Sequence, residues 1–79
     1  MNTKEQVIQI IQKISSNESI KESDTLLGDI GLDSLGMITL LHDLESHFHI
    51  RLDESDMNSY DLVRVSDVIA LAEKYAGGS

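Results

Sequence analysis

Ser34 occupies the position in this chain that best suits a side chain to chemistry. It lies in the stretch Gly31-Leu32-Asp33-Ser34-Leu35-Gly36, directly before a run of apolar residues at helical spacing. A serine at such a junction is typical of a helix N-terminus, where unpaired backbone N–H groups need a side-chain oxygen. Local physics alone therefore predicts that Ser34 is a helix cap.

The surroundings of Ser34 do not predict a catalytic serine. A hydrolase needs a base and an oxyanion hole, and this segment is not a Gly-x-Ser-x-Gly turn with a later Asp and His. The position does suit an oxygen that carries a phosphate, because a helix N-terminus stabilises a nearby anion by about 0.3 to 1 kcal/mol. An external transferase would then activate the hydroxyl.

The three histidines and an acidic segment are the candidates for metal binding. His42 and His47 are five residues apart, about 500° around a helix, so they do not share a face well, and His49 follows the helix. We expect no metal site there. Segment 53–56 resembles a calcium loop only in its acidity, because it lacks the glycine and terminal glutamate of an EF-hand, and weak divalent binding stays open.

The composition predicts one small helical domain. The chain has 79 residues, no cysteine and no proline, so packing between helices must hold the core without disulfides or a Cys-based zinc site. The net charge of −8 opposes binding to nucleic acid or to an anionic membrane. No stretch approaches the roughly 20 apolar residues of a membrane span, and residues 1–4 are not followed by an apolar run long enough for a signal segment. We therefore expect a cytoplasmic protein.

Two periodic patterns predict the first two helices. Thr3 and Gln6 form a capping-box pattern at the start of the first helix, which ends near residues 15–17. Its apolar face is Val7, Ile8, Ile11 and Ile14. The second helix should run from about Ser34 to residue 48 or 49, with its stripe at Leu35, Ile38, Leu41, Leu44 and Phe48.

Met37 and Leu40 lie beside that stripe, so the second helix is apolar over an unusually wide arc. Met37 either fills the core or forms an exposed contact for a partner. The expected core combines residues of three helices: Leu41, Leu44, Phe48, Val7, Ile11, Ile14, Val68 and Ile69.

The segments between the helices are recognised because their apolar residues do not recur at helical spacing. Residues 16–33 predict a long loop that holds Ser34 in place, pinned by Leu26, Leu27, Ile30 and Leu32. Residues 50–52 predict an extended connector, and 53–61 a short third helix around Met57 and Tyr60. The last helix is marked by Val65, Val68, Ile69, Ala72 and Ala76, with Asp67 in its first turn. The domain is expected to span residues 1–76, with a flexible tail at 77–79.

The residues around Ser34 resemble the attachment site of the acyl carrier protein family. The resemblance rests on Asp33-Ser34-Leu35 after Gly31-Leu32, and on the helix that ends in Leu44-Glu45-Ser46-His47-Phe48. Further matching positions are Leu26, Asp29, Ile50-Arg51-Leu52 and Val65-Ser66-Asp67-Val68. The likeness covers residues 3–76, nearly the whole chain.

This resemblance implies an all-α fold, a four-helix bundle of acyl-carrier-protein type with three longer helices, a short third helix and a long loop between the first two. It implies that Ser34, framed by Asp33 and Leu35, receives 4′-phosphopantetheine from coenzyme A through a magnesium-dependent holo-carrier-protein synthase. The arm ends in a thiol that carries acyl or aminoacyl groups as thioesters between enzymes. On this interpretation the chain is a carrier and not an enzyme.

The sequence departs from the carriers of fatty acid synthesis at two positions. Those carriers usually have acidic residues two and five positions after the serine, where this chain has Gly36 and Thr39. Asp-Ser-Leu-Gly looks more like the discrete carriers of polyketide, nonribosomal peptide or other specialised pathways. Arg64 stands where the family often has a threonine cap before the last helix.

Acidic residues concentrate around the second helix. Between Asp29 and Asp61 the chain has eight acidic residues and one basic residue, Arg51. We expect this cluster to attract basic patches on partner enzymes through weak, salt-sensitive contacts. The candidate contact residues on the helix are Met37, Ile38, Asp43 and Glu45. We expect the carrier itself to be a monomer.

Two other functions fit parts of the same pattern. An acidic helical inhibitor or adaptor would bind a basic partner through the second helix and use Ser34 only as a cap. A small calcium-binding helical protein would use the acidic segment at 53–56. Modification of Ser34 separates the carrier from both alternatives, because neither of them needs it.

Overall fold

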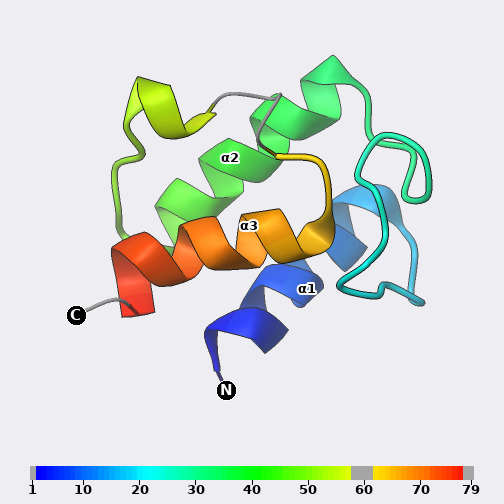
Figure 1. Cartoon of the computed structure of the whole chain (residues 1–79), viewed down its shortest axis with the longest axis horizontal. Coiled ribbons are helices and arrows are strands. Elements are labelled where there is room, and N and C mark those ends of the chain that lie inside the picture. The colour runs from blue at the N-terminus through cyan, green and yellow to red at the C-terminus, as the bar shows by residue number, and fades with distance from the viewer. Residues whose placement is uncertain (1, 58–61, 78–79) are drawn as a thin grey trace.

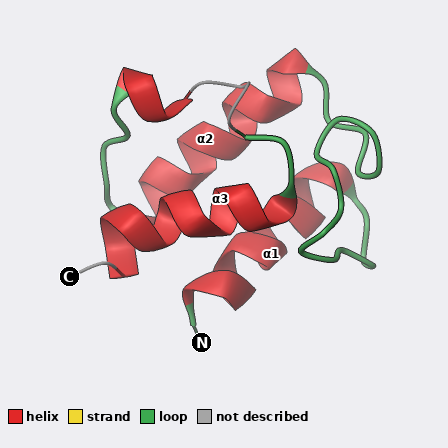
Figure 2. Ribbon diagram, in the orientation of Figure 1, coloured by secondary structure: helices red, strands yellow, loops and turns green. Residues whose placement is uncertain are grey.

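The computed structural model describes residues 2–57 and 62–77, and this part of the chain is helical (Figure 1, Figure 2). In order, its elements are α1 (Thr3–Ser15), α2 (Ser34–Phe48), the 3₁₀ turn η1 (Glu54–Met57), α3 (Val65–Ala72) and the π-helical turn η2 (Glu73–Gly77). The described residues contain no strand and one isolated bridge, between Thr25 and Arg64. The all-α prediction is confirmed, with the short third helix seen as one 3₁₀ turn.

Two predicted features fall partly on residues 58–61 and 78–79, outside the described residues. Tyr60, expected in the third helix, is among them. The predicted tail at 77–79 is described only at Gly77, which still belongs to the last helical turn. None of the described helices is long and apolar enough to span a membrane.

The first helix begins with a different cap from the one predicted. The side chain of Asn2 accepts a hydrogen bond from the Glu5 backbone N–H at 2.8 Å, so Asn2 is the N-cap and Thr3 is already helical. The predicted Thr3–Gln6 capping box is therefore wrong by one residue. Gln6 instead donates its side-chain N–H to the Asn2 backbone oxygen at 3.3 Å.

The core lies where α1 contacts both α2 and α3, and Figure 1 shows α3 lying across the other two. Its largest fully buried side chains come from all three helices and the loop: Val7, Ile11, Leu26, Leu40, Leu44, Val65 and Val68. The expected core residues are buried except Ile14 and Phe48, which pack against it half-buried. The hydrophobic core therefore includes side chains of the loop as well as side chains of the helices.

The predicted stripe of α2 is wrong at its N-terminal end. Leu35 is 70% exposed and Ile38 is 55% exposed, whereas Met37 and Leu40 are buried. The first turns of α2 are apolar on several sides, so periodicity alone allows either face to turn inward. Packing against α1 and the loop selects the face that contains Met37.

The loop from residue 16 to 33 is tied to the segment before α3. The Leu26 N–H donates to the Val63 oxygen, and the Val65 N–H donates to the Asp24 oxygen, both at 2.9 Å. Leu26 is fully buried and Leu32 is 7% exposed, so these two leucines anchor the loop as predicted. Leu27 does not, because it is 64% exposed. Figure 2 shows this loop beside the start of α3.

The last helix begins without a serine or threonine cap. Asp67, in its first turn, accepts hydrogen bonds from the backbone N–H groups of Arg64 at 2.9 Å and Val63 at 3.1 Å. The Arg64 guanidinium donates to the Ser23 backbone oxygen in the loop at 2.6 Å. Arg64 thus serves the fold by joining the loop to the start of α3.

The C-terminal turn is held to η1 by a polar cluster. Lys74 pairs with both Asp56 carboxylate oxygens at 3.1 Å, and the Tyr75 hydroxyl donates to the same carboxylate. The Asp53 N–H donates to the Tyr75 oxygen at 3.2 Å. The bonds from Tyr75 and then Lys74 hold the pKa of Asp56 below its ordinary value of 3.8.

Acid should weaken this cluster. A lowered pKa in the folded state means that ionised Asp56 contributes stability above its ordinary pKa, and that this contribution is lost as the pH falls through the lowered value. Asp56→Asn should therefore lose less stability than the wild type between about pH 4 and pH 2. Chemical denaturation across this range tests it, and parallel pH profiles for the two proteins would contradict it.

Gly31 gives a second test of the fold, because its φ is +85° at the end of the loop. Gly31→Ala should lower the free energy of unfolding by about 1 kcal/mol through backbone strain. A Cβ added there meets no atom within 4 Å, so steric crowding does not contribute. Gly31→Asn is the control and should lose less, because asparagine tolerates positive φ better. Equal denaturation midpoints for alanine and asparagine would refute this explanation.

Candidate functional site

Ser34 is the first residue of α2, and it is exposed. The helix is capped by the preceding residue: Asp33 has an extended backbone, and its side-chain oxygen accepts the Gly36 N–H at 2.7 Å. The expectation that Ser34 is the cap is wrong, because aspartate takes that role. No described residue forms a hydrogen bond to the Ser34 hydroxyl, so its oxygen is presented to solvent at the helix N-terminus.

Gly36 allows the cap to fit closely. A Cβ at this position would lie 3.2 Å from a methyl carbon of Leu32 and 3.3 Å from the Asp33 oxygen that caps the helix. The missing side chain leaves room for both groups. Gly36 stands where fatty acid carriers usually have an acidic residue. In this chain the absence of a side chain there has a reason in the local packing.

The loop before Ser34 is folded into a tight turn. The Thr25 N–H donates to the Asp29 carboxylate, and the Asp29 N–H donates to the Thr25 hydroxyl oxygen, each at 2.9 Å. Hydrogen bonding by Thr25, mainly through its backbone N–H, holds the pKa of Asp29 below its ordinary value. The Leu32 N–H then donates to the Leu26 oxygen at 2.9 Å. The chain therefore enters α2 from a fixed direction.

The four predicted partner contacts are placed in three different environments. Met37 is 8% exposed and belongs to the core, so the core-filling alternative holds for it and the exposed contact does not. Ile38 is exposed as a contact would need. Glu45 is half-buried, and its carboxylate accepts the Leu52 N–H at 2.9 Å, which holds the connector against α2.

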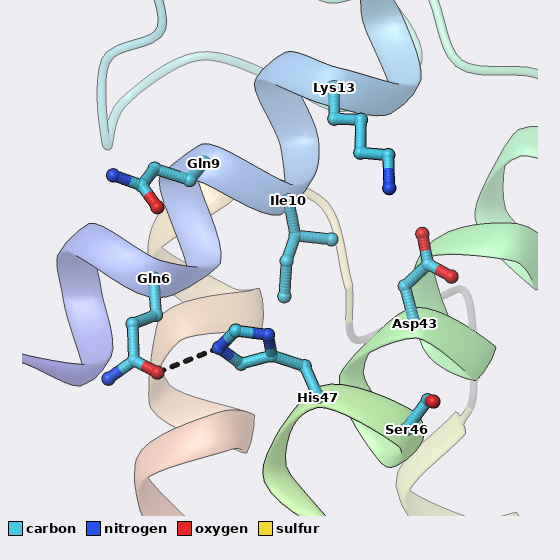
Figure 3. A pocket seen from close by; sticks show the side chains of 7 residues that line it. All are labelled: Gln6, Gln9, Ile10, Lys13, Asp43, Ser46 and His47. Atoms are coloured by element: carbon cyan, nitrogen blue, oxygen red, sulfur yellow. Dashed lines mark hydrogen bonds between the residues drawn. The ribbon is translucent and has the colours of Figure 1, made fainter.

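Asp43 lines a hollow of about 330 Å³ between α1 and α2 (Figure 3). Lys13 of α1 points toward Asp43. Across the same hollow, His47 is hydrogen-bonded to the Gln6 side chain at 2.7 Å. Asp43 follows Ser34 by nine residues, about 900° around the helix, so the two lie on opposite sides of α2. The hollow is thus separate from the serine.

The described ranges 2–57 and 62–77 contain no group of three or more His, Cys, Asp or Glu side chains that could hold a metal ion. One carboxylate of the acidic segment is already bound within the fold. Asp56 binds Lys74 and Tyr75, as shown above.

Three comparisons with known proteins agree with this geometry. A family model described as a phosphopantetheine attachment site matches residues 5–72. The chain is 34% identical to an acyl carrier protein homolog of Mycoplasmopsis pulmonis, over 94% of this chain and 96% of the relative. It is 33% identical to the acyl carrier protein of Thermotoga maritima, over 86% and 83%. Among solved structures, a putative acyl carrier protein from Mycobacterium tuberculosis aligns with a TM-score of 0.84 at 27% identity, covering 92% of this chain and 97% of that one.

The Asp33 cap can be tested apart from any modification. Asp33→Ala should lower the free energy of unfolding by about 1 kcal/mol, because the Gly36 N–H loses its acceptor. Asp33→Asn is the matched control, since its side-chain oxygen can still accept, and it should stay within a few tenths of a kcal/mol of the wild type. Chemical denaturation measures both. If the alanine variant is as stable as the asparagine variant, the cap does not hold α2.

Proposed function

The chain belongs to the acyl carrier protein family, and on that premise we propose that Ser34 is the residue that carries its 4′-phosphopantetheine. A carrier of this family holds acyl groups on the covalently attached arm. The observation that supports Ser34 is its unengaged hydroxyl at the first position of α2, with Asp33 in the capping role.

The geometry around Ser34 explains how a serine without its own base can accept the arm. Its Oγ attacks the phosphorus of coenzyme A to which pantetheine is attached. A new P–O bond forms, the nucleotide part leaves as adenosine 3′,5′-bisphosphate, and the hydroxyl proton passes to the transferase. The new phosphodiester carries a negative charge beside the N-terminus of α2, which stabilises it by about 0.3 to 1 kcal/mol. The chain itself contributes position and charge but no catalytic group.

Carrier proteins work with partner enzymes, and we propose two kinds for this chain: a holo-carrier-protein synthase, and enzymes that load or remove acyl groups. The net charge of −8 favours basic partners at long range. Exposed carboxylates lie on both sides of α2 in the chain, at Asp29 and Asp33 before it and at Asp53 after it. Such charges speed encounter more than they add affinity, which suits a carrier that must also leave.

Attachment to Ser34 predicts a single modification that depends on this residue. Incubation with coenzyme A and a broad-specificity phosphopantetheinyl transferase should add the mass of one phosphopantetheine to the wild type, and none to Ser34→Ala. Ser46→Ala, which removes another exposed serine of α2, should still gain it. Intact-protein mass spectrometry measures all three. Addition to Ser34→Ala would refute the assignment, as would no addition to the wild type.

A further inference from the structure

The hollow between α1 and α2 has a lining that the proposed function does not use. Polar side chains of both helices form its walls, and Ile10, which is 8% exposed, lies at its floor (Figure 3). Its volume of about 330 Å³ is near the lower end of ligand pockets, about 300 to 1,000 Å³, so a ligand that fits it is small. The polar lining residues are Gln6, Gln9 and Lys13 from α1, and Asp43, Ser46 and His47 from α2.

Two opposite charges in this hollow are not paired with each other or with another described residue. Lys13 points toward Asp43, but the ion pairs of the described residues lie elsewhere, on other lysines. Asp43 is half-buried, and no described residue donates a hydrogen bond to its carboxylate. A carboxylate in such a place has lost part of its hydration, and no protein group replaces it. A ligand that donates to Asp43 would supply the missing hydrogen bonds.

The histidine of the same lining adds an acceptor beside this carboxylate. The Gln6 side-chain N–H donates to the Asn2 backbone oxygen, so it is the Gln6 side-chain oxygen that accepts from the Nε2 atom of His47 at 2.7 Å. In the neutral imidazole the other ring nitrogen, Nδ1, is then an acceptor. His47 follows Asp43 by four residues, so the two side chains lie on one face of α2. The α2 wall therefore presents acceptors, opposite the ammonium group of Lys13 on α1.

We propose that this hollow binds a small zwitterion of the α-amino acid class. The ligand's ammonium group donates to Asp43 and His47, its carboxylate pairs with Lys13, and an aliphatic side chain lies on Ile10. A simple anion is repelled by Asp43 and a simple cation by Lys13, so the two charges together select a ligand that has both. The site lies on the opposite side of α2 from Ser34, and binding does not require the serine to be modified.

The test is a titration of the isotope-labelled protein with valine at neutral pH, followed by the backbone amide signals in NMR spectra. The signals of residues 9–13 and 43–47 should shift and saturate with a Kd of about 1 mM, a weak affinity that suits a ligand of few atoms. Valinamide lacks the carboxylate and N-acetylvaline lacks the ammonium group, so each should bind about tenfold more weakly or less.

Charge variants assign the binding to the two walls. Asp43→Asn and Lys13→Gln should each raise the Kd for valine about tenfold, because each removes one charged partner of the ligand. Glu5→Gln and Lys4→Gln are the matched controls, since they remove the same charges from α1 at positions outside the lining, and they should bind valine as the wild type does.

The proposal is wrong if valine causes no saturable shift at the hollow, or if valinamide or N-acetylvaline binds as tightly as valine. Unchanged binding by either Asp43→Asn or Lys13→Gln would also overturn it. The ligand-free spectra of both variants should otherwise overlay that of the wild type, because neither side chain is paired within the described fold. A loss of binding with this overlay therefore reports the contact with the ligand.

Discussion

The hydrogen bond from the Gly36 N–H to the Asp33 carboxylate is the contact on which the site depends. A helix N-terminus has several unpaired N–H groups, and a hydroxyl at its first position would otherwise compete to satisfy one of them. Because the Asp33 carboxylate accepts the Gly36 N–H at 2.7 Å, the Ser34 hydroxyl is not needed as an acceptor for this group. The missing side chain of Gly36 gives the carboxylate and Leu32 room to approach. Leu32, Asp33 and Gly36 together thus form the cap, and Ser34 stays exposed beside it.

The loop fixes where this cap forms. A domain of 79 residues has a small core, and here the loop contributes two of its buried leucines, Leu26 and Leu32. The Leu26 N–H donates to the Val63 oxygen and the Val65 N–H donates to the Asp24 oxygen, and these two bonds join the loop to the start of α3. The direction in which the chain enters α2 is therefore set by the packing of α3, and the position of Ser34 depends on a segment thirty residues later in the sequence.

Periodicity was sufficient to predict the helices but not which face of α2 is buried. The bounds of α1 and α2 follow from regular apolar spacing and from residues that favour helix ends. The first turns of α2 contain Leu35, Met37 and Ile38, which lie on different sides, and the choice among them depends on the shape of the core formed by α1 and the loop. The cap was assigned to serine because both Asp33 and Ser34 are good caps, and backbone geometry alone distinguishes them.

The exposure of Leu35 and Ile38 has a thermodynamic consequence for the domain. Burial of a leucine or isoleucine contributes about 1.5 to 3 kcal/mol, and neither side chain supplies that to folding here. In a domain with a small core, the stabilisation that these two side chains do not supply is large compared with a net stability of about 5 to 15 kcal/mol. Other side chains must therefore complete the core, among them Leu26 and Leu32 of the loop.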